Sequence, residues 1–389
     1  MAVIAIPISL QSMITIGVNM TDTVMVGKLG ETSLSATALA NQFVNIYQIC
    51  CMGIAMGASV LTSRFWGMQD ITSLKKTITL MLRLCIVLAV LFMLPTILIP
   101  QLLMRMYTND SAVIAQGVQY FKWMVYCYFL QGMTMTCTIV LRSVGQVNFP
   151  LFTSIGSFFV NILFNYMFIF GKLGVPRMEV EGAGVGTLIA RVFEFSLICG
   201  YFLFVDRKIG YRLKDLRMKC NSLIKDYVSI SIPVFVSDSL LALGTSAVAM
   251  VMGRVGTGFV SANSITVVTQ QLTTVIIQGI CHASCIMTGH TLGHGEREKA
   301  QQQAWTFLIL GLVVGILGGG LIKVLSRPII GLYNITPETA QIAGELMDAI
   351  AFSVIFQSMN SILTKGVLRG GGNTKFLMLA FTESNFVWL

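Results

Sequence analysis

The stretch VGKLGETSLSA, residues 26–36, returns as MGRVGTGFVSA at residues 252–262, a shift of 226 positions. The same shift carries Pro7 onto Pro233. Helical solenoids repeat about every 20 to 50 residues, so a period this long indicates a duplicated bundle instead. The sequence therefore predicts two copies of one unit, arranged in the same direction along the chain.

The composition is that of a membrane protein. Hydrophobic residues make up 55% of the chain, charged residues only 11%, and the mean hydropathy is +0.78, whereas soluble domains have about 25% charged residues. Apolar stretches long enough to span a bilayer recur along the chain. We expect membrane spans at residues 3–27, 33–60, 74–100, 112–139, 148–170, 182–205, 228–252, 259–288, 302–325 and 338–366, with a further span opening at 376.

These spans predict an all-α polytopic membrane protein made of two parallel six-helix repeats. Two copies with an even number of crossings are related by an axis along the membrane normal, as in secondary carriers. We expect an N-terminal lobe at 1–205, a cytoplasmic linker at 206–226 and a C-terminal lobe at 227–389. The second copy stops about 43 residues before its repeat is complete. We therefore expect a C-terminally truncated chain, with about ten complete spans and part of an eleventh, whose parent has twelve.

The net charge of +9 follows membrane topology, so it does not indicate a nucleic-acid partner. With a cytoplasmic N-terminus, seventeen lysines and arginines fall in inward loops and seven in outward loops. This bias predicts a multi-pass protein of the cell membrane with its N-terminus in the cytoplasm. The basic linker at 206–226 reads either as a solvated face or as a contact with lipid headgroups.

Asp22 is the clearest candidate for chemistry, because it lies in an apolar span. A carboxylate at bilayer depth costs at least about 2.5 to 3.5 kcal/mol, so its presence needs a reason. One interpretation is an interfacial aspartate that reaches the outer headgroups. The other is a proton or cation site, which we favour.

Prolines interrupt the first span of each copy. Pro7 and Pro233 each remove a backbone hydrogen bond and allow a bend, so protonation of Asp22 could alter the shape of the first span. Asp238 follows Pro233 by five residues, whereas the position equivalent to Asp22 is Val248. Each copy is therefore expected to carry its own acid, at a different depth.

Polar residues on the fifth and sixth spans are further candidates. Asn161 and Asn165 are four residues apart, so their amides share a helix face and could bind Asp22 or a cation, or serve as polar contacts between helices. Arg191 and Glu194 are three apart, a spacing that permits a neutralising ion pair with a structural role.

The second span carries Asn41, Gln42, Asn45 and Gln48 over two helical turns. These residues suggest a water-lined face, although packing contacts explain them equally well.

The sequence indicates no metal or cofactor. Cys281, Cys285 and His290 lack the spacing of a structural zinc site, and the glycines at 370–372 do not form a nucleotide-binding loop. The nine cysteines fall almost wholly within spans and are expected to be packing residues. Energy for transport would then come from an ion gradient.

Taken together, several segments resemble the multidrug and toxic compound extrusion (MATE) family. The resemblance covers essentially the whole chain. The segments are DTVMVGKLG at 22–30, GRVGTGFVSAN from 253, LRSVG at 141–145, LRGGG at 368–372, NILFNYMFIFG at 161–171 and EGAGVGTLIA at 181–190.

The resemblance implies a transporter and not an enzyme, with two six-helix bundles that export organic cations in exchange for protons or sodium. It places Asp22, Asn161 and Asn165 in the N-terminal cavity, and Asp238 near the acidic position of the seventh span. Some members have an aspartate where this chain has Asn165, and others have a carboxylate at the position of Ser358, so the coupling ion stays open, with protons favoured.

The expected partners are a cationic amphipathic small molecule and membrane lipid, and the expected state is a monomer. The alternative function is a flippase for lipid-linked or polysaccharide precursors, which have related architecture. A diphosphate would require several inward-facing cations, whereas Arg191 is the arginine deep in a span.

Overall fold

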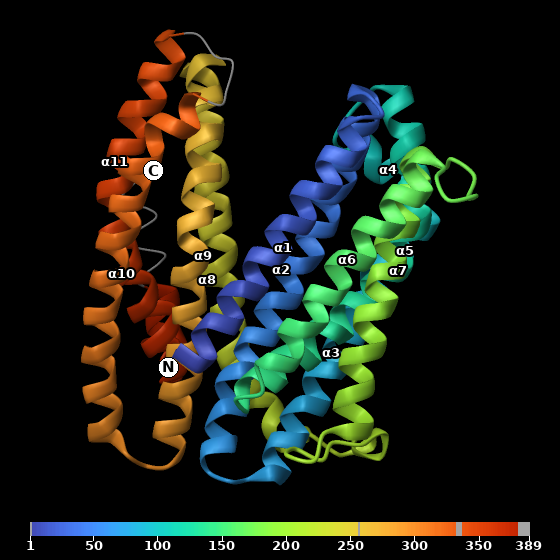
Figure 1. The fold of residues 1–389 in the computed structure, drawn as a ribbon. Helices are drawn as coiled ribbons and strands as arrows, with labels where there is room; N and C mark the ends of the chain where they lie inside the picture. Colours follow the sequence, from blue (N-terminus) through green and yellow to red (C-terminus); the bar gives the residue numbers. More distant parts are fainter. Residues whose placement is uncertain (1, 256, 332–336, 380–389) are drawn as a thin grey trace. The chain divides into compact units, whose positions relative to one another are not determined.

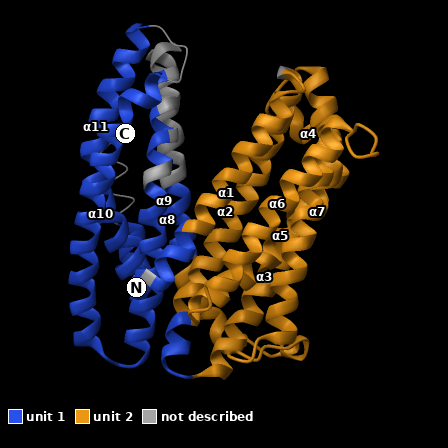
Figure 2. Cartoon of the chain, viewed as in Figure 1, with its two compact units in different colours: residues 1–9, 63–69, 232–389 blue, residues 10–62, 70–231 orange. Residues whose placement is uncertain are grey.

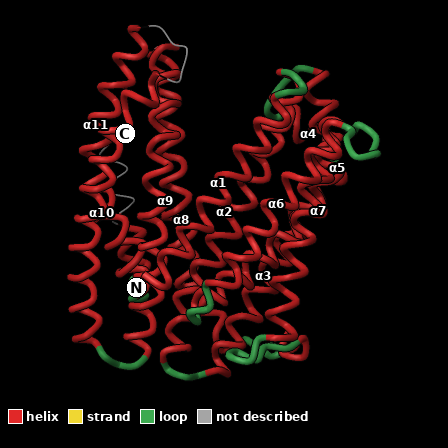
Figure 3. Tube along the Cα trace, viewed as in Figure 1, coloured by secondary structure: helices red, strands yellow, loops and turns green. Residues whose placement is uncertain are grey.

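The computed structural model describes residues 2–255, 257–331 and 337–379, and these are helical apart from turns and connecting loops (Figures 1 and 3). The long helices are α1 (Ala2–Gly27), α2 (Glu31–Gly67), α3 (Ile71–Leu98), α5 (Ser111–Ser143), α6 (Asn148–Phe170), α7 (Glu179–Gly200), α8 (Asn221–Val255), α9 (Thr257–Gly293), α10 (Arg297–Gly331) and α11 (Pro337–Ser361). The short ones are α4 (Pro100–Arg105), η1 (Tyr201–Val205), η2 (Leu213–Arg217) and η3 (Ile362–Leu368).

Each of the ten complete spans predicted from the sequence coincides with one long helix, so the all-α prediction is confirmed. Nine helices in the described residues are long and apolar enough to cross a membrane. The predicted eleventh span, opening at 376, lies outside the described residues beyond position 379. The total of twelve spans stays a prediction.

Side chains close the ends of several helices. Asp70 is the N-cap residue of α3, and its carboxylate accepts a hydrogen bond from the Ser73 backbone N–H at 3.0 Å. The hydrogen bonds from Ser73 hold the pKa of Asp70 below its usual value. Asp110 caps α5 in the same way, through the Ala112 N–H at 2.8 Å. These caps satisfy N–H groups that have no partner inside the helix.

The chain divides into two compact units (Figure 2). One unit contains residues 10–62 and 70–231, and the other contains 1–9, 63–69 and 232–389. Helices α1, α2 and α8 therefore each contribute to both units. The lobe boundaries expected from the sequence, at residues 205 and 227, stay a prediction.

The unit of residues 10–62 and 70–231 is built around α5, which packs against α3 and α7, while α7 also packs against α6. An aromatic cluster fills its core, where the Tyr47 and Tyr128 rings lie 5.0 Å apart. The Tyr47 hydroxyl donates to the Tyr128 carbonyl oxygen at 2.5 Å. This bond pairs a fully buried hydroxyl, whose burial without a partner would be destabilising.

In the unit of residues 1–9, 63–69 and 232–389, α9, α10, α11 and η3 pack against one another. Glycines of α10 let this helix approach the backbone of α11 closely. A Cβ at Gly319 would meet the Ala351 carbonyl group, and one at Gly315 would lie 2.9 Å from the Ile355 backbone. Close approach through small residues is the usual way in which membrane helices associate.

Residues 206–220 connect η1 to α8. Residues 221–226, which the sequence assigned to the linker, instead form the first turns of α8. Their polar composition marks a helix that continues beyond its apolar span.

A glycine in α7 provides a test of the packing. A Cβ at Gly182 would lie 2.6 Å from the carbonyl carbon and oxygen of Phe168, which are backbone atoms of α6. We expect Gly182→Ala to lower the free energy of unfolding by about 1–3 kcal/mol, because the two helices must separate. Thermal unfolding of the purified protein measures this.

Gly200→Ala, in the same helix, is the matched control, since nothing lies within 4 Å of a Cβ there. It should leave the unfolding midpoint unchanged or raise it, because alanine favours helix. Equal midpoints for the two variants would contradict the proposed packing constraint.

Candidate functional site

A cavity of about 310 Å³ lies within the unit of residues 10–62 and 70–231, lined by α1, α2, α5, α6 and α7. Sixteen of its 25 lining residues are polar, so the site suits a ligand that forms hydrogen bonds. The polar residues are Thr15, Asn19, Asp22, Thr23, Thr37, Asn41, Asn45, Gln48, Tyr120, Gln131, Ser154, Ser157, Asn161, Thr187, Arg191 and Glu194.

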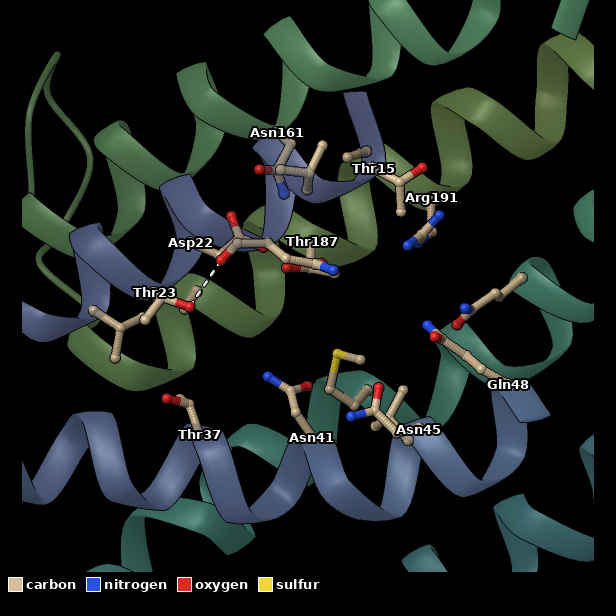
Figure 4. Close-up of a pocket in the computed structure, with 18 of the residues that line it drawn as sticks. Thr15, Asp22, Thr23, Thr37, Asn41, Asn45, Gln48, Asn161, Thr187 and Arg191 are labelled. Carbon is tan, nitrogen blue, oxygen red and sulfur yellow. Dashed lines mark hydrogen bonds between the residues drawn. The ribbon is translucent and has the colours of Figure 1, made fainter. Parts of the chain in front are cut away.

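Asp22 points into this cavity from α1 (Figure 4). Its Oδ1 accepts a hydrogen bond from Asn165 Nδ2 at 2.6 Å, and the same nitrogen lies 3.3 Å from Asn161 Oδ1. Both asparagines are buried, with exposed fractions of 2% for Asn161 and 0% for Asn165. The three side chains thus lie together, as their spacing allowed, with Asp22 and Asn161 lining the cavity and Asn165 buried outside its lining. A role for them in binding a proton or a cation stays a prediction.

The glycine at position 186 makes this cluster possible. A Cβ there would overlap Asn165 Oδ1 and lie 2.9 Å from the Asn165 backbone nitrogen. Only a residue without a side chain lets α7 approach α6 this closely, so Gly186 sets the position of the amide that binds Asp22.

Arg191 and Glu194 line the same cavity and form the ion pair that their spacing predicted. Arg191 Nη1 donates to Glu194 Oε2 at 2.8 Å. The Arg191 side chain is 28% exposed and that of Glu194 is 12% exposed. Because these two formal charges cancel, Asp22 is the remaining acidic group of the lining and has no ion-pair partner in the described residues.

The second span contributes a row of amides. Asn41, Asn45 and Gln48 project from α2 across the cavity, facing the side that holds Asp22 (Figure 4). Gln42 was expected to belong to this face, and this expectation was wrong. It is exposed and does not line the cavity, because successive helical residues point about 100° apart.

Other lining residues were not identified from the sequence. Ser154 and Ser157 precede Asn161 on α6 by seven and four residues, so they lie on the same helix face. Thr187 precedes Arg191 by four residues on α7 in the same way. Their spacing of four or seven residues from polar residues already singled out in the same apolar span could have identified them from the sequence.

Comparison with known proteins identifies the family. The MatE family model matches residues 7–167 and again residues 233–387. The chain belongs to the MatE family. The two matches begin 226 residues apart, which is the shift of the internal repeat. Members of this family are transporters and not enzymes, as the resemblance implied.

Similar proteins include multidrug transporters. The probable multidrug resistance protein NorM of Thermotoga maritima is 24% identical over 377 residues, covering 95% of this chain and 79% of that protein. The uncharacterized transporter YisQ of Bacillus subtilis is 24% identical over 365 residues, covering 91% and 78% of the two chains.

Solved structures share the fold. A mutant of the Vibrio cholerae MATE transporter VcmN has a TM-score of 0.90 and 17% identity, over 99% of this chain and 86% of that one. A MOP superfamily transporter from Pyrococcus furiosus has a TM-score of 0.86 and 19% identity, over 98% and 84%.

The second predicted acid of this MatE chain lies in the other unit. Asp238 Oδ1 accepts a hydrogen bond from Arg369 Nη2 at 2.9 Å. The Arg369 side chain is 4% exposed and that of Asp238 is 26% exposed. This carboxylate is therefore neutralised by a buried arginine, unlike Asp22.

A related contact occurs in the first repeat of the MatE chain. Arg142, which aligns with Arg369, donates through Nη2 to Gln11 Oε1. Gln11 in turn donates to Ser154 Oγ at 2.8 Å. In both repeats an arginine at the end of the fourth span contacts the first span shortly after its proline, but the first repeat offers an amide and the second a carboxylate.

The Asp238–Arg369 pair gives a stability prediction. We expect Asp238→Asn to lower the free energy of unfolding by about 3 kcal/mol, because it leaves a buried guanidinium without its counter-charge. Thermal unfolding in detergent measures the effect.

Asp348→Asn is the matched control. Asp348 pairs with Lys323, and both side chains are exposed, Asp348 by 51% and Lys323 by 62%. The substitution should therefore change the free energy of unfolding by no more than about 1 kcal/mol. Equal losses of stability in the two variants would show that burial does not govern the strength of these pairs.

Proposed function

We propose that this chain exports small organic cations across the cell membrane in exchange for protons, by alternating access of two helical lobes. Membership of the MatE family and similarity to proteins named multidrug resistance protein support efflux of small molecules. The finer points, which are the charge of the cargo and the identity of the coupling ion, rest on the cavity.

The observation that carries the proposal is the pairing pattern of the charges in the cavity. Glu194 is bound by Arg191, whereas Asp22 contacts the neutral amide of Asn165. An amide hydrogen bond orients a carboxylate without cancelling its charge. Asp22 is thus suited to attract a cation, and protonation would remove that attraction.

The proton and the organic cation compete for the same carboxylate, that of Asp22, and this competition couples their transport. When Asp22 is ionised, it holds the organic cation against the amides of α2. When a proton from the outer side binds Asp22, the cavity loses its net negative charge and the cation leaves. Because proton and cargo exclude each other at one group, a proton gradient can drive export.

Helix α1 is suited to respond to this event. Thr21 and Thr23, on either side of Asp22, donate their hydroxyls to the carbonyl oxygens of Gly17 and Asn19 at 2.8 and 2.7 Å. Hydroxyls bonded in this way bend helices, and Pro7 removes a further backbone bond from the same helix. A change at Asp22 would therefore act on a helix that is easily bent.

Sodium is the alternative coupling ion, because carboxylate and amide oxygens also bind alkali cations. The flippase alternative has less support, since the guanidinium of Arg191 is already neutralised by Glu194 and does not offer free charge to a diphosphate. We further propose a monomer with a cytoplasmic N-terminus, which rests on the distribution of basic residues.

The first test concerns coupling. In everted membrane vesicles with an imposed proton gradient, Asp22→Asn should reduce transport of ethidium by about tenfold or more, because an amide neither takes up a proton nor attracts a cation. Imposing a sodium gradient without a proton gradient tests whether sodium can drive transport in place of protons.

Asp348→Asn is the control, since Asp348 is an exposed carboxylate that does not line the cavity. It should transport ethidium as the unmodified chain does. Unchanged proton-driven transport in Asp22→Asn would refute the proposed coupling, and transport driven by sodium alone would replace the proton with sodium.

The second test concerns Gly186. Gly186→Ala should displace Asn165 and remove its hydrogen bond to Asp22, and a hydrogen bond to a charged group contributes about 1.5–3 kcal/mol. Asp22 would then no longer be held in its orientation, so ethidium binding should weaken by about tenfold. Binding is measured by fluorescence titration of the purified protein.

A double-mutant cycle isolates the cause. If Gly186 acts through the amide, adding Gly186→Ala to Asn165→Ala should produce no further loss. Gly200→Ala, in the same helix, should bind ethidium normally. Additive losses in the double variant would show that Gly186 acts by another route.

A further inference from the structure

Residues 206–220, which we call the strap, are fixed along one face of α3. Lys75, Thr79 and Arg83 are spaced four residues apart, so they share that face. Lys75 Nζ donates to the Gly210 carbonyl at 2.6 Å and pairs with Asp215 at 3.0 Å.

The other two residues of this face extend the attachment. Thr79 Oγ1 lies 2.9 Å from the Tyr211 hydroxyl. Arg83 donates to the carbonyls of Leu216 and Met218 at 2.6 and 3.0 Å. The strap is thus a folded segment of fixed position and not a loose linker.

Internal contacts hold the strap in shape. Asp206 is buried, accepts from Gln146 Nε2 at 2.9 Å and from the Ile209 N–H at 3.0 Å. Tyr211 stacks on Phe202 with ring centroids 5.5 Å apart. Burial raises the pKa of Tyr211 to about 12, so its hydroxyl keeps its proton at neutral pH. The strap therefore presents its remaining side chains in a defined arrangement.

Those remaining side chains are cationic. Both acids of the strap are engaged, Asp206 inside the fold and Asp215 with Lys75. Arg212 donates to backbone carbonyl oxygens, among them that of Leu203 at 2.7 Å. Besides Arg212, five exposed cations of the strap form no ion pair with the described residues, and these are Arg207, Lys208, Lys214, Arg217 and Lys219.

Exposed apolar side chains accompany the cations. Leu213, on η2, is 60% exposed, and Phe204 and Val205, where η1 meets the strap, are 70% and 60% exposed. Cations beside apolar groups are typical of segments that lie at the boundary between headgroups and acyl chains. The strap is placed there by its connection, because it follows directly on the end of a membrane-spanning stretch, residues 179–205.

We propose that the strap binds the headgroups of anionic phospholipids. The five cations match the phosphate charge, and the apolar side chains would insert among the acyl chains below it. Basic clusters next to a membrane span attract anionic lipids through the surface potential. A soluble polyanion would satisfy the cations but would leave Leu213 and Phe204 in water, so the combination favours lipid. This site is separate from the cavity and does not rest on the proposed function.

The test uses the full chain in phosphatidylcholine nanodiscs that contain a minor share of brominated lipid. Leu213→Trp supplies a reporter, and the fluorescence of the same chain without this substitution is subtracted. Brominated phosphatidylglycerol should quench the introduced tryptophan about twofold or more compared with brominated phosphatidylcholine at equal share. The preference should fall with added salt, because the five cations are exposed.

A variant with all five cations changed to glutamine, carrying the same reporter, should lose the preference. The matched control changes Lys28, Arg105 and Lys172, exposed cations outside the strap, to glutamine and should keep the preference. Soluble glycerol phosphate should not reverse the quenching, which separates lipid from free phosphate.

Equal quenching by the two lipids, a preference that survives the fivefold substitution, or reversal by glycerol phosphate would each overturn the proposal. Because quenching reports lipid contact and not transport, failure of the export mechanism would leave this result unaffected.

Discussion

A polar group inside a membrane span has to find its partner within the protein, and this constraint organises the described part of the molecule. The carboxylate of Asp22 is bound by Asn165, the guanidinium of Arg191 by Glu194, and the hydroxyl of Tyr47 by a backbone carbonyl. Lipid offers no hydrogen bonds, so the bonds of Asp22 to Asn165 and of Tyr47 to the Tyr128 carbonyl fix the rotation of one helix against another, whereas the Arg191–Glu194 pair neutralises two charges within α7. The cavity exists where these rotations turn several polar faces toward one space.

The sequence predicted the helices well, because bilayer thickness leaves few alternatives to a long apolar helix. It also predicted that Asn161 and Asn165 share a face and that Arg191 pairs with Glu194, since both follow from spacing along one helix. Contacts between different helices were harder to predict. That Asn165 binds Asp22 directly, and that Gln42 faces away from the cavity, depends on helix rotation, which spacing alone does not determine.

The contacts of the strap show the same limit. Its basic composition was evident, and lipid contact was one of two interpretations left open. That Lys75, Thr79 and Arg83 of a distant helix hold it in place could not be inferred, because these residues lie more than 130 positions away from their partners. The composition predicted that the strap is basic, whereas only the fold shows that the strap is held in a fixed position against α3.

The arginines at the ends of the fourth spans, Arg142 and Arg369, show how a duplicated architecture diverges. One meets the amide of Gln11 and the other the carboxylate of Asp238. A carboxylate accepts hydrogen bonds and carries a charge, whereas an amide both donates and accepts and is neutral. The same arginine position therefore forms an ion pair in one half and a bond to a neutral group in the other. Descendants of one ancestral bundle have become chemically distinct while keeping a common scaffold.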